Sequence, residues 1–425
     1  MASCVADNIA YPHRRSLFRI NVFLPALYLY FFFNSAALPL GLQYTTLLAP
    51  FFYIWLLKNR QKWVIRRFAL CSLPFLIAHL AHGVDAKTYA VSLCLIFTVY
   101  LTIYSFCIAV KKCRDLRGLF RNVIIANFIF VCFAIPFRYS EYSSIFWWTT
   151  FISEELVQIP RLKLLTYEAS YYATLLVPFF LYSYFRMIFF KKRADYLLCM
   201  ITSIPLGLSL SFGVIGGIAC TLLLTHIIYF RKIFRINSRY VILMLPVTAL
   251  IVAIVVAKTS LGVRLVEVVT GQDQSGTGRT VWSYLLSYQV AIQKSLYWGV
   301  GFGQVKMYFD TMFEYMQETF KRGWMNASLY NSIAELVATT GIVGATIKLA
   351  AELLLFFKTK CYKNCFRFSL FIFIFIYQFT GSYLTNVAEY VIWCLAFIEL
   401  FPEFALQDKT KLQQVTSLFQ PGAAT

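Results

Sequence analysis

Long apolar runs follow one another along this chain, and short basic segments separate many of them. A helix rises about 1.5 Å per residue, so a run of about 20 apolar residues matches the thickness of a bilayer. The pattern therefore predicts about twelve membrane-spanning helices. They lie near 17–34, 41–57, 68–82, 88–110, 122–137, 171–190, 195–211, 214–230, 240–257, 329–357, 368–384 and 388–402.

The composition agrees with this pattern. Of 425 residues, 60% are hydrophobic and only 14% are charged, whereas soluble proteins carry about 25% charged residues. An ordinary water-soluble or disordered protein is excluded. We predict an all-α, polytopic integral membrane protein in which residues 1–425 form a single membrane domain.

The formal charge of +20 is concentrated in alternate loops. Nucleic-acid binding would need a basic face with interleaved aromatic residues on a soluble module, and the sequence predicts no such module. Positively charged loops of membrane proteins face the cytoplasm. We therefore expect these loops and both termini on the cytoplasmic side of the membrane. The basic residues of the five loops, one loop after another, are Lys58, Arg60, Lys62, Arg66 and Arg67; Lys111, Lys112, Arg114, Arg117 and Arg121; Lys191, Lys192 and Arg193; Arg231, Lys232, Arg235 and Arg239; and Lys358, Lys360, Lys363 and Arg367.

Two of the remaining loops are long, at 138–170 and 258–328, and this topology places both on the periplasmic side. They hold most of the polar chemistry in the chain. Neither contains a cysteine, so we expect no disulfide and no structural metal. The third predicted span contains His79 and His82, which suggest either a proton relay or metal pair, or more simply two histidines wetted at the outer interface.

The first long loop carries a candidate acid–base pair. Arg161 and Glu168 are seven residues apart, so they share one face if this segment is helical. Glu168 precedes the sixth predicted span, where the helix dipole favours an anion. Its carboxylate is a candidate general base for a sugar hydroxyl. A helix cap or an interfacial salt bridge is the simpler alternative.

The second long loop combines arginines with glycines. Arg264 and Arg279 offer planar guanidinium groups that match phosphate oxygens. The glycines at 271–278 and 299–303 let the backbone approach a ligand closely. The glycine-to-lysine spacing of a P-loop is missing, which excludes that motif.

The tenth predicted span begins at Tyr330 and Asn331, with its N-terminus on the same outer side. Unpaired backbone N–H groups and the positive end of the helix dipole would then face the arginines. Two helix N-termini and three arginines around one cavity form a site for a polyanion at the membrane surface. A lipid pyrophosphate fits that description.

These segments, in this order, resemble the O-antigen polymerase and O-antigen ligase superfamily (the Wzy and WaaL classes). The resemblance covers roughly residues 160–345 by motif and the whole chain by architecture, and Ala169 stands where that superfamily often has a proline. Its elements are Arg161 with Tyr167, Glu168 and Ala169; Ser-Gly-Thr-Gly-Arg at 275–279, followed by Trp282 and the glycines of 299–303; and Asn331 with Gly341 and Gly344.

One departure separates the two classes. Ligases of this superfamily have a histidine directly before the asparagine, but this chain has Tyr330 there, which favours the polymerase. The resemblance implies a GT-C-like, metal-independent glycosyltransferase that needs no cofactor. Its substrates would be undecaprenyl-pyrophosphate-linked oligosaccharide repeats, and a chain-length-regulating co-polymerase would be a partner.

The sequence thus predicts an O-antigen polymerase that joins lipid-linked repeats at the periplasmic face. Arg279 and Arg264 would bind the pyrophosphate with Arg161 nearby, Glu168 would be the general base, and Tyr330 and Asn331 would position the phosphate or the acceptor sugar. An O-antigen ligase and a lipid-linked oligosaccharide flippase remain the alternatives. A flippase needs ionisable residues along a path between helices, and this chain keeps few charges within its predicted spans.

Overall fold

The computed structural model describes residues 25–34, 43–113, 115–152, 157–229, 278–308, 329 and 331–405. Within them the chain is mostly helical, and the apolar helices make it a multi-pass membrane protein. The span predicted at 240–257 lies outside the described residues. Six described segments are long and apolar enough to cross a membrane: α5 (Val64–Ala81), α6 (Ala86–Lys112), α7 with the 3-10 turn η3 (Leu116–Tyr139), α9 (Ala169–Phe190), the helix Phe212–Tyr229 and α16 (Ser332–Lys358).

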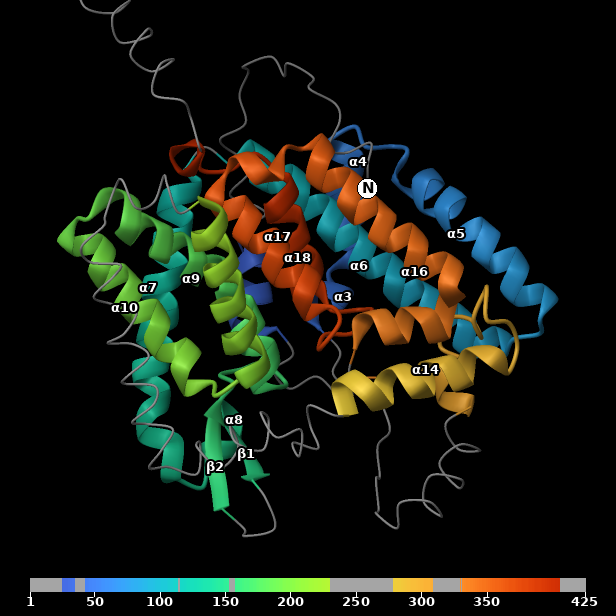
Figure 1. Ribbon diagram of the computed structural model, residues 1–425, viewed down its shortest axis with the longest axis horizontal. Helices are drawn as coiled ribbons and strands as arrows, with labels where there is room; N and C mark the ends of the chain where they lie inside the picture. Colours follow the sequence, from blue (N-terminus) through green and yellow to red (C-terminus); the bar gives the residue numbers. More distant parts are fainter. Residues whose placement is uncertain are drawn as a thin grey trace, which may run out of the picture.

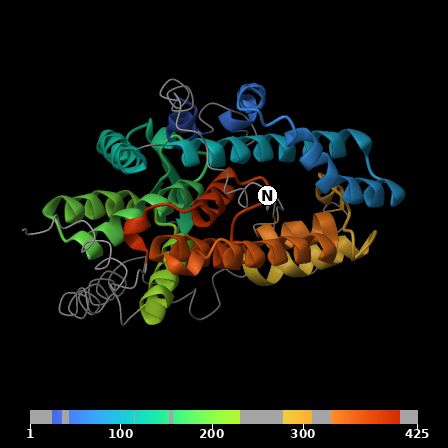
Figure 2. The ribbon, with the colours of Figure 1, turned by 90° about the horizontal axis from the view of Figure 1, so that it is seen from above.

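Two shorter helices, α17 (Cys365–Tyr377) and α18 (Val387–Phe397), lie in the interior. α17 and α18 are only about 20 and 16 Å long at about 1.5 Å per residue, less than the 30 Å hydrocarbon thickness of a bilayer. Almost all of their residues are buried, and in Figure 2 the red C-terminal segment lies between α6 and α16. The shorter elements are η1 (Leu29–Phe33), α3 (Tyr44–Leu47), α4 (Ala49–Lys58), α8 (Ser143–Phe146), α10 (Arg193–Leu208), η4 (Gly278–Trp282), α14 (Ser283–Ile292), η5 (Cys361–Lys363), α17 (Cys365–Tyr377), α18 (Val387–Phe397) and η6 (Pro402–Phe404).

Contacts between loops bring the basic segments together at one end of the molecule. Lys112, at the end of α6, donates a hydrogen bond to Asn59, which follows α4 (2.7 Å). Arg117, at the start of α7, forms an ion pair with Glu403 of η6 (2.8 Å). An aromatic contact joins η6 to the end of α9, and a β-bridge joins the segment after η6 to the loop between α16 and α17. We call this the basic end.

The opposite end carries a β-hairpin, visible below the helices in Figure 1 together with α14. Strands β1 (Trp147–Ile152) and β2 (Val157–Leu162) pair antiparallel, with Trp147 opposite Leu162. Aromatic and β-branched residues favour strands. The indole of Trp147 is buried and donates to the carbonyl of Ala134 (2.9 Å), which holds the hairpin on the end of α7. The prediction of an all-α protein overlooked this hairpin.

Helix α16 is broken at Gly341, whose backbone (φ 68°, ψ −172°) is accessible almost only to glycine. Four backbone hydrogen bonds of 2.9–3.2 Å join residues 338–343 to 296–301 and satisfy the groups that the break frees. The break folds the first segment of α16 back. Ser332 therefore lies 3.4 Å from the amine of Lys348, sixteen residues later, a separation of about 24 Å in a straight helix.

One cysteine expectation is corrected. Cys107 of α6 and Cys394 of α18 form a disulfide, with Cα atoms 6.1 Å apart. Both residues lie in apolar segments, and the sequence argument considered only the long outside loops. The bond ties a long helix to the short buried helix α18.

Candidate functional site

Arg161 and Arg279 border the same turn, at 209–213, which connects α10 to the helix Phe212–Tyr229. Strand β2 positions Arg161, whose Nε donates to the carbonyl of Ser209 (3.1 Å). The short helix η4 positions Arg279, and a Cβ built on Gly213 would lie 3.8 Å from its Nη1. Two cations that are far apart in the sequence thus meet at one turn.

Glu168 stands at the start of α9, as predicted, but it does not share a helix face with Arg161. Arg161 lies on a strand, and an irregular segment leads from β2 to the helix. The Glu168 side chain forms no capping hydrogen bond to α9. Instead, its Oε1 accepts a hydrogen bond of 2.5 Å from the hydroxyl of Ser170.

Tyr377, the last residue of α17, connects the two halves of this region. Its phenol interacts electrostatically with the guanidinium of Arg279 and with the carboxylate of Glu168. The candidate phosphate ligand and the candidate base therefore belong to one neighbourhood, together with Tyr377. Sequence analysis did not select Tyr377, because it ends an uninterrupted apolar run.

Asn331 is held by backbone groups on every side. Its Oδ1 caps α16 by accepting from the N–H groups of Ile333 (3.1 Å) and Ala334 (3.0 Å). Its Nδ2 donates to the carbonyls of Arg279 (3.0 Å) and Phe379. The expectation of unpaired N–H groups at this helix start is therefore wrong, because Asn331 and carbonyls of the α17–α18 loop satisfy them.

The α17–α18 loop (378–386) contacts each part of this region. Its Tyr383 accepts a hydrogen bond from the hydroxyl of Tyr167, directly before Glu168 (2.6 Å). Burial raises the pKa of both phenols well above the usual value, so both stay neutral. Sequence analysis missed this loop, although polar and turn-forming residues between two short apolar helices were its signal.

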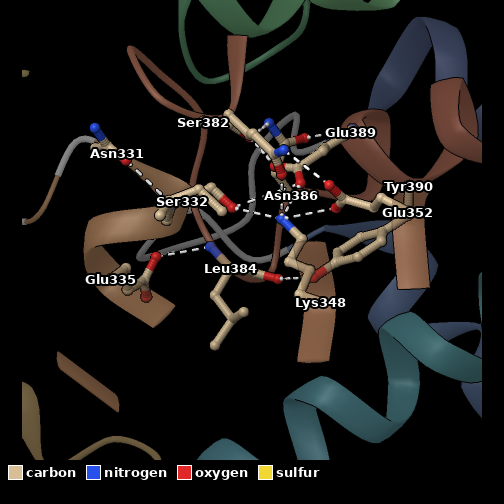
Figure 3. Close-up of polar contacts among 12 residues, drawn as sticks. Asn331, Ser332, Glu335, Lys348, Glu352, Ser382, Leu384, Asn386, Glu389 and Tyr390 are labelled. Atoms are coloured by element: carbon tan, nitrogen blue, oxygen red, sulfur yellow. Dashed lines mark hydrogen bonds and ion pairs between the residues drawn. The ribbon is translucent and has the colours of Figure 1, made fainter. Parts of the chain in front are cut away.

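A buried polar cluster lies against the same loop (Figure 3). The amine of Lys348 donates to Glu389 Oε1 and to Gln378 Oε1, each at 2.8 Å, and lies 3.7 Å from Glu352 Oε1. Glu389 also accepts from the hydroxyl of Ser382 (2.7 Å). The cluster therefore links the interior of α16 to the loop that holds Asn331.

The glycines at 299–303 approach protein rather than leave space for a ligand. A Cβ on Gly299 would lie 2.5 Å from the carbonyl carbon of Thr339, and one on Gly303 would lie 2.1 Å from the hydroxyl of Ser92. We call 295–304 the glycine segment. It packs between the break in α16 and helix α6. The expectation that its glycines let the backbone approach a ligand is therefore corrected, because they approach other parts of the protein.

His79 of α5 and His82, directly after that helix, differ in burial. His79 is buried, and its ring nitrogens bond to the hydroxyl of Tyr89 (3.0 Å) and the carbonyl of Trp298 (2.7 Å). The prediction that the interface wets His79 is wrong, because this side chain anchors the glycine segment. His82 is exposed, as expected.

Arg264 and Tyr330 lie outside the described residues, and the glycines at 271–277 do so as well. In the part of the chain that the structure describes, no group of three or more histidine, cysteine or acidic residues could hold a metal ion. The structure thus places Arg161 and Arg279 at one turn, Glu168 and Arg279 within electrostatic range of Tyr377, and the Asn331 side chain on the backbone carbonyl of Arg279.

No protein-family model matches the chain, and no curated protein matches it either.

Proposed function

We propose that this protein is an O-antigen polymerase of the Wzy class, a membrane glycosyltransferase. The acceptor hydroxyl of a lipid-linked repeat attacks the anomeric carbon of the growing glycan. The bond from that carbon to undecaprenyl pyrophosphate breaks, the pyrophosphate leaves with the electron pair, and the hydroxyl proton goes to a base. The observation that carries the proposal is the meeting of Arg161 and Arg279 at the turn 209–213.

Two guanidinium groups at one turn suit a diphosphate, because each offers paired N–H donors to phosphate oxygens. We assign Arg279 and Arg161 to the pyrophosphate, and Arg264 to the same group. Donors aimed at a departing anion act mainly by stabilising the charge that develops in the transition state. Pyrophosphate is already a good leaving group, and the resemblance to the O-antigen polymerase superfamily implies a reaction without metal or cofactor.

Glu168 is our candidate for the base that accepts the hydroxyl proton. Its second carboxylate oxygen faces no ion pair within the described residues, so it has no competing cation there. Asn331 acts on the substrate through Arg279, because its amide groups already bond to the backbone. Tyr330 keeps its proposed role of positioning the phosphate or the acceptor sugar.

We place the reaction on the periplasmic side of a bacterial inner membrane. The basic end would face the cytoplasm by the positive-inside rule, and both termini would lie there. The hairpin, Arg279 and Asn331 lie at the other end, where flipped lipid-linked oligosaccharides are available. A chain-length-regulating co-polymerase is the protein partner that the resemblance implies.

The direct test uses purified protein in lipid vesicles with one defined undecaprenyl-pyrophosphate-linked repeat and no added metal or nucleotide. We expect polymer with more than one repeat, and an equal amount when a chelator is present. The R279A variant should leave the repeat unpolymerised, whereas R117A, which removes an arginine at the basic end, should polymerise normally. Absence of polymer with the wild-type protein contradicts the proposal.

A flippase is the second candidate, favoured by the broken helix α16 and its buried charges. Discontinuous helices and intramembrane ionisable residues are common in transporters. A cell that lacks a polymerase makes lipopolysaccharide capped by a single repeat, whereas one that lacks the flippase makes none. A cell that lacks a ligase would accumulate polymer on its lipid carrier, but Tyr330 stands where the ligase histidine belongs.

A further inference from the structure

The buried cluster around Lys348 has more negative than positive groups. One ammonium stands against two carboxylates, those of Glu389 (2.8 Å) and Glu352 (3.7 Å). Glu389 is fully buried and Glu352 nearly so. If both carboxylates were ionised, the cluster would hold a net charge of −1 in an apolar interior, which costs several kcal/mol as an order of magnitude.

Hydrogen bonds show which carboxylate is ionised. An ammonium has three N–H donors. Lys348 gives one to Glu389 and one to Gln378, each at 2.8 Å, while Ser332 lies at 3.4 Å. Glu389 gains a further donor from the hydroxyl of Ser382. Both oxygens of Glu389 thus accept hydrogen bonds, as an ionised carboxylate requires.

Glu352 accepts fewer hydrogen bonds than Glu389 does. Its Oε2 accepts from the side-chain amide of Gln378 (2.8 Å), but its Oε1 is buried and has no hydrogen-bond partner. A carboxylic acid tolerates this environment better than a carboxylate, because it carries no charge. We propose that the cluster is a binding site for one exchangeable proton, which Glu352 carries.

Occupancy of this site would control the α17–α18 loop. When Glu352 loses its proton, its new charge competes with Glu389 for Lys348. Since Glu389 accepts from Ser382 and Lys348 donates to Gln378, the start and the middle of the loop depend on that ammonium. The proton on Glu352 therefore maintains the ion pair between Lys348 and Glu389, and with it the position of the loop whose Phe379 carbonyl accepts from Asn331.

The other ionisable groups around the cluster come from α16 and α18, and Lys306, outside both helices, acts electrostatically on Glu335. Glu335 of α16 accepts a hydrogen bond from the backbone N–H of Leu384 (2.7 Å) and acts electrostatically on Lys348. Tyr390 of α18 donates to the carbonyl of Leu384 (2.9 Å), and α17 contributes only neutral groups at its end. Glu335 is thus the control for Glu352, since it belongs to the same helix and contacts the same loop at a different residue.

Infrared spectroscopy of the purified full-length protein in lipid tests where the proton lies. The carbonyl band of a protonated carboxylic acid should be present at neutral pH and shift in heavy water. E352Q should remove that band, and E335Q should keep it. A spectrum in which E352Q loses no acid band, or a wild-type protein with no such band, overturns the proposal.

Hydrogen–deuterium exchange tests the consequence for the loop. At each pH, the wild-type protein is compared with E352Q, which cannot ionise. Amides of 378–386 should exchange equally in both proteins at low pH, and several-fold faster in the wild type at high pH, where Glu352 is ionised. Equal exchange at every pH rejects the proposal. Neither readout involves glycan synthesis, so failure here is distinct from failure of the proposed function.

Discussion

The side-chain amide of Asn331 donates a hydrogen bond to the backbone carbonyl of Arg279 over 3.0 Å. The residue that caps α16 thereby fixes the backbone of the strongest candidate phosphate ligand. A side chain that touches no substrate can control a reaction in this way, because a displacement of about 1 Å can cost about a hundredfold in rate.

N331D should separate the two tasks of this amide. Aspartate caps a helix about as well as asparagine does, but it cannot donate to the carbonyls of Arg279 and Phe379. We expect glycan synthesis to fall by about tenfold or more, or about 1.4 kcal/mol in transition-state stabilisation, while the protein remains inserted. N331A should also lower the thermal midpoint, since losing a cap costs about 0.5–2 kcal/mol. Normal chain lengths from N331D would show that the contact to Arg279 is dispensable.

Arg279 itself should be needed for its shape as well as its charge. R279A should lower the rate of polymerisation by about 100- to 1,000-fold, equivalent to about 2.7–4 kcal/mol, which is typical for one lost donor to a developing anion. R279K should recover only part of this, because an ammonium lacks the paired donors of a guanidinium. Glycan length profiles from cells and initial rates in vesicles measure both, with R117A as the unaffected control.

The break in α16 should tolerate no side chain at Gly341. A Cβ there would lie 2.1 Å from the carbonyl oxygen of Tyr297, and the backbone has φ 68°. G341A should lower the free energy of unfolding by about 2–6 kcal/mol, from backbone strain and a clash. G216A meets no atom within 4 Å in a helix, and should be neutral or stabilising by up to about 1 kcal/mol. Thermal midpoints in detergent compare the two, and similar values would argue against the break.

Lys348 should matter mainly because Glu389 needs it. K348M leaves a fully buried carboxylate without its cation, and we expect a loss of about 3–5 kcal/mol in the free energy of unfolding. Adding E389Q removes the orphaned charge, so the double variant should recover most of that loss. Equilibrium unfolding in mixed micelles gives both values. If the double variant is as unstable as K348M, the ion pair is not the reason for the effect.

Apolar runs and basic loops predicted the coarse architecture well. The basic loop that contains Lys112 and Arg117 contacts Asn59 of the preceding basic loop and Glu403 of η6, so these segments lie at one end of the molecule. Arg161, Glu168 and Arg279 share one neighbourhood, although they come from a strand, a helix start and a short helical turn. The positions of basic loops can be predicted from the sequence because they depend on the membrane, which favours positively charged loops on one side whatever the rest of the fold.

Features that depend on a particular partner could not be predicted. A lone glycine such as Gly341 within an apolar run costs a helix only about 1 kcal/mol, so nothing in the sequence marks it as a break. The glycines of the glycine segment indicate that its backbone closely approaches another group, but the sequence does not say whether that group is a ligand or the protein itself. The amide of Asn331 suits phosphate and backbone equally, and only the folded chain shows that Arg279 and Phe379 occupy it.

The four backbone hydrogen bonds between α16 and the glycine segment also limit how the molecule can open. Pulling the two apart would leave eight peptide groups without partners in a medium that offers few substitutes. Residues 296–301 and the first half of α16 must therefore travel as one rigid piece.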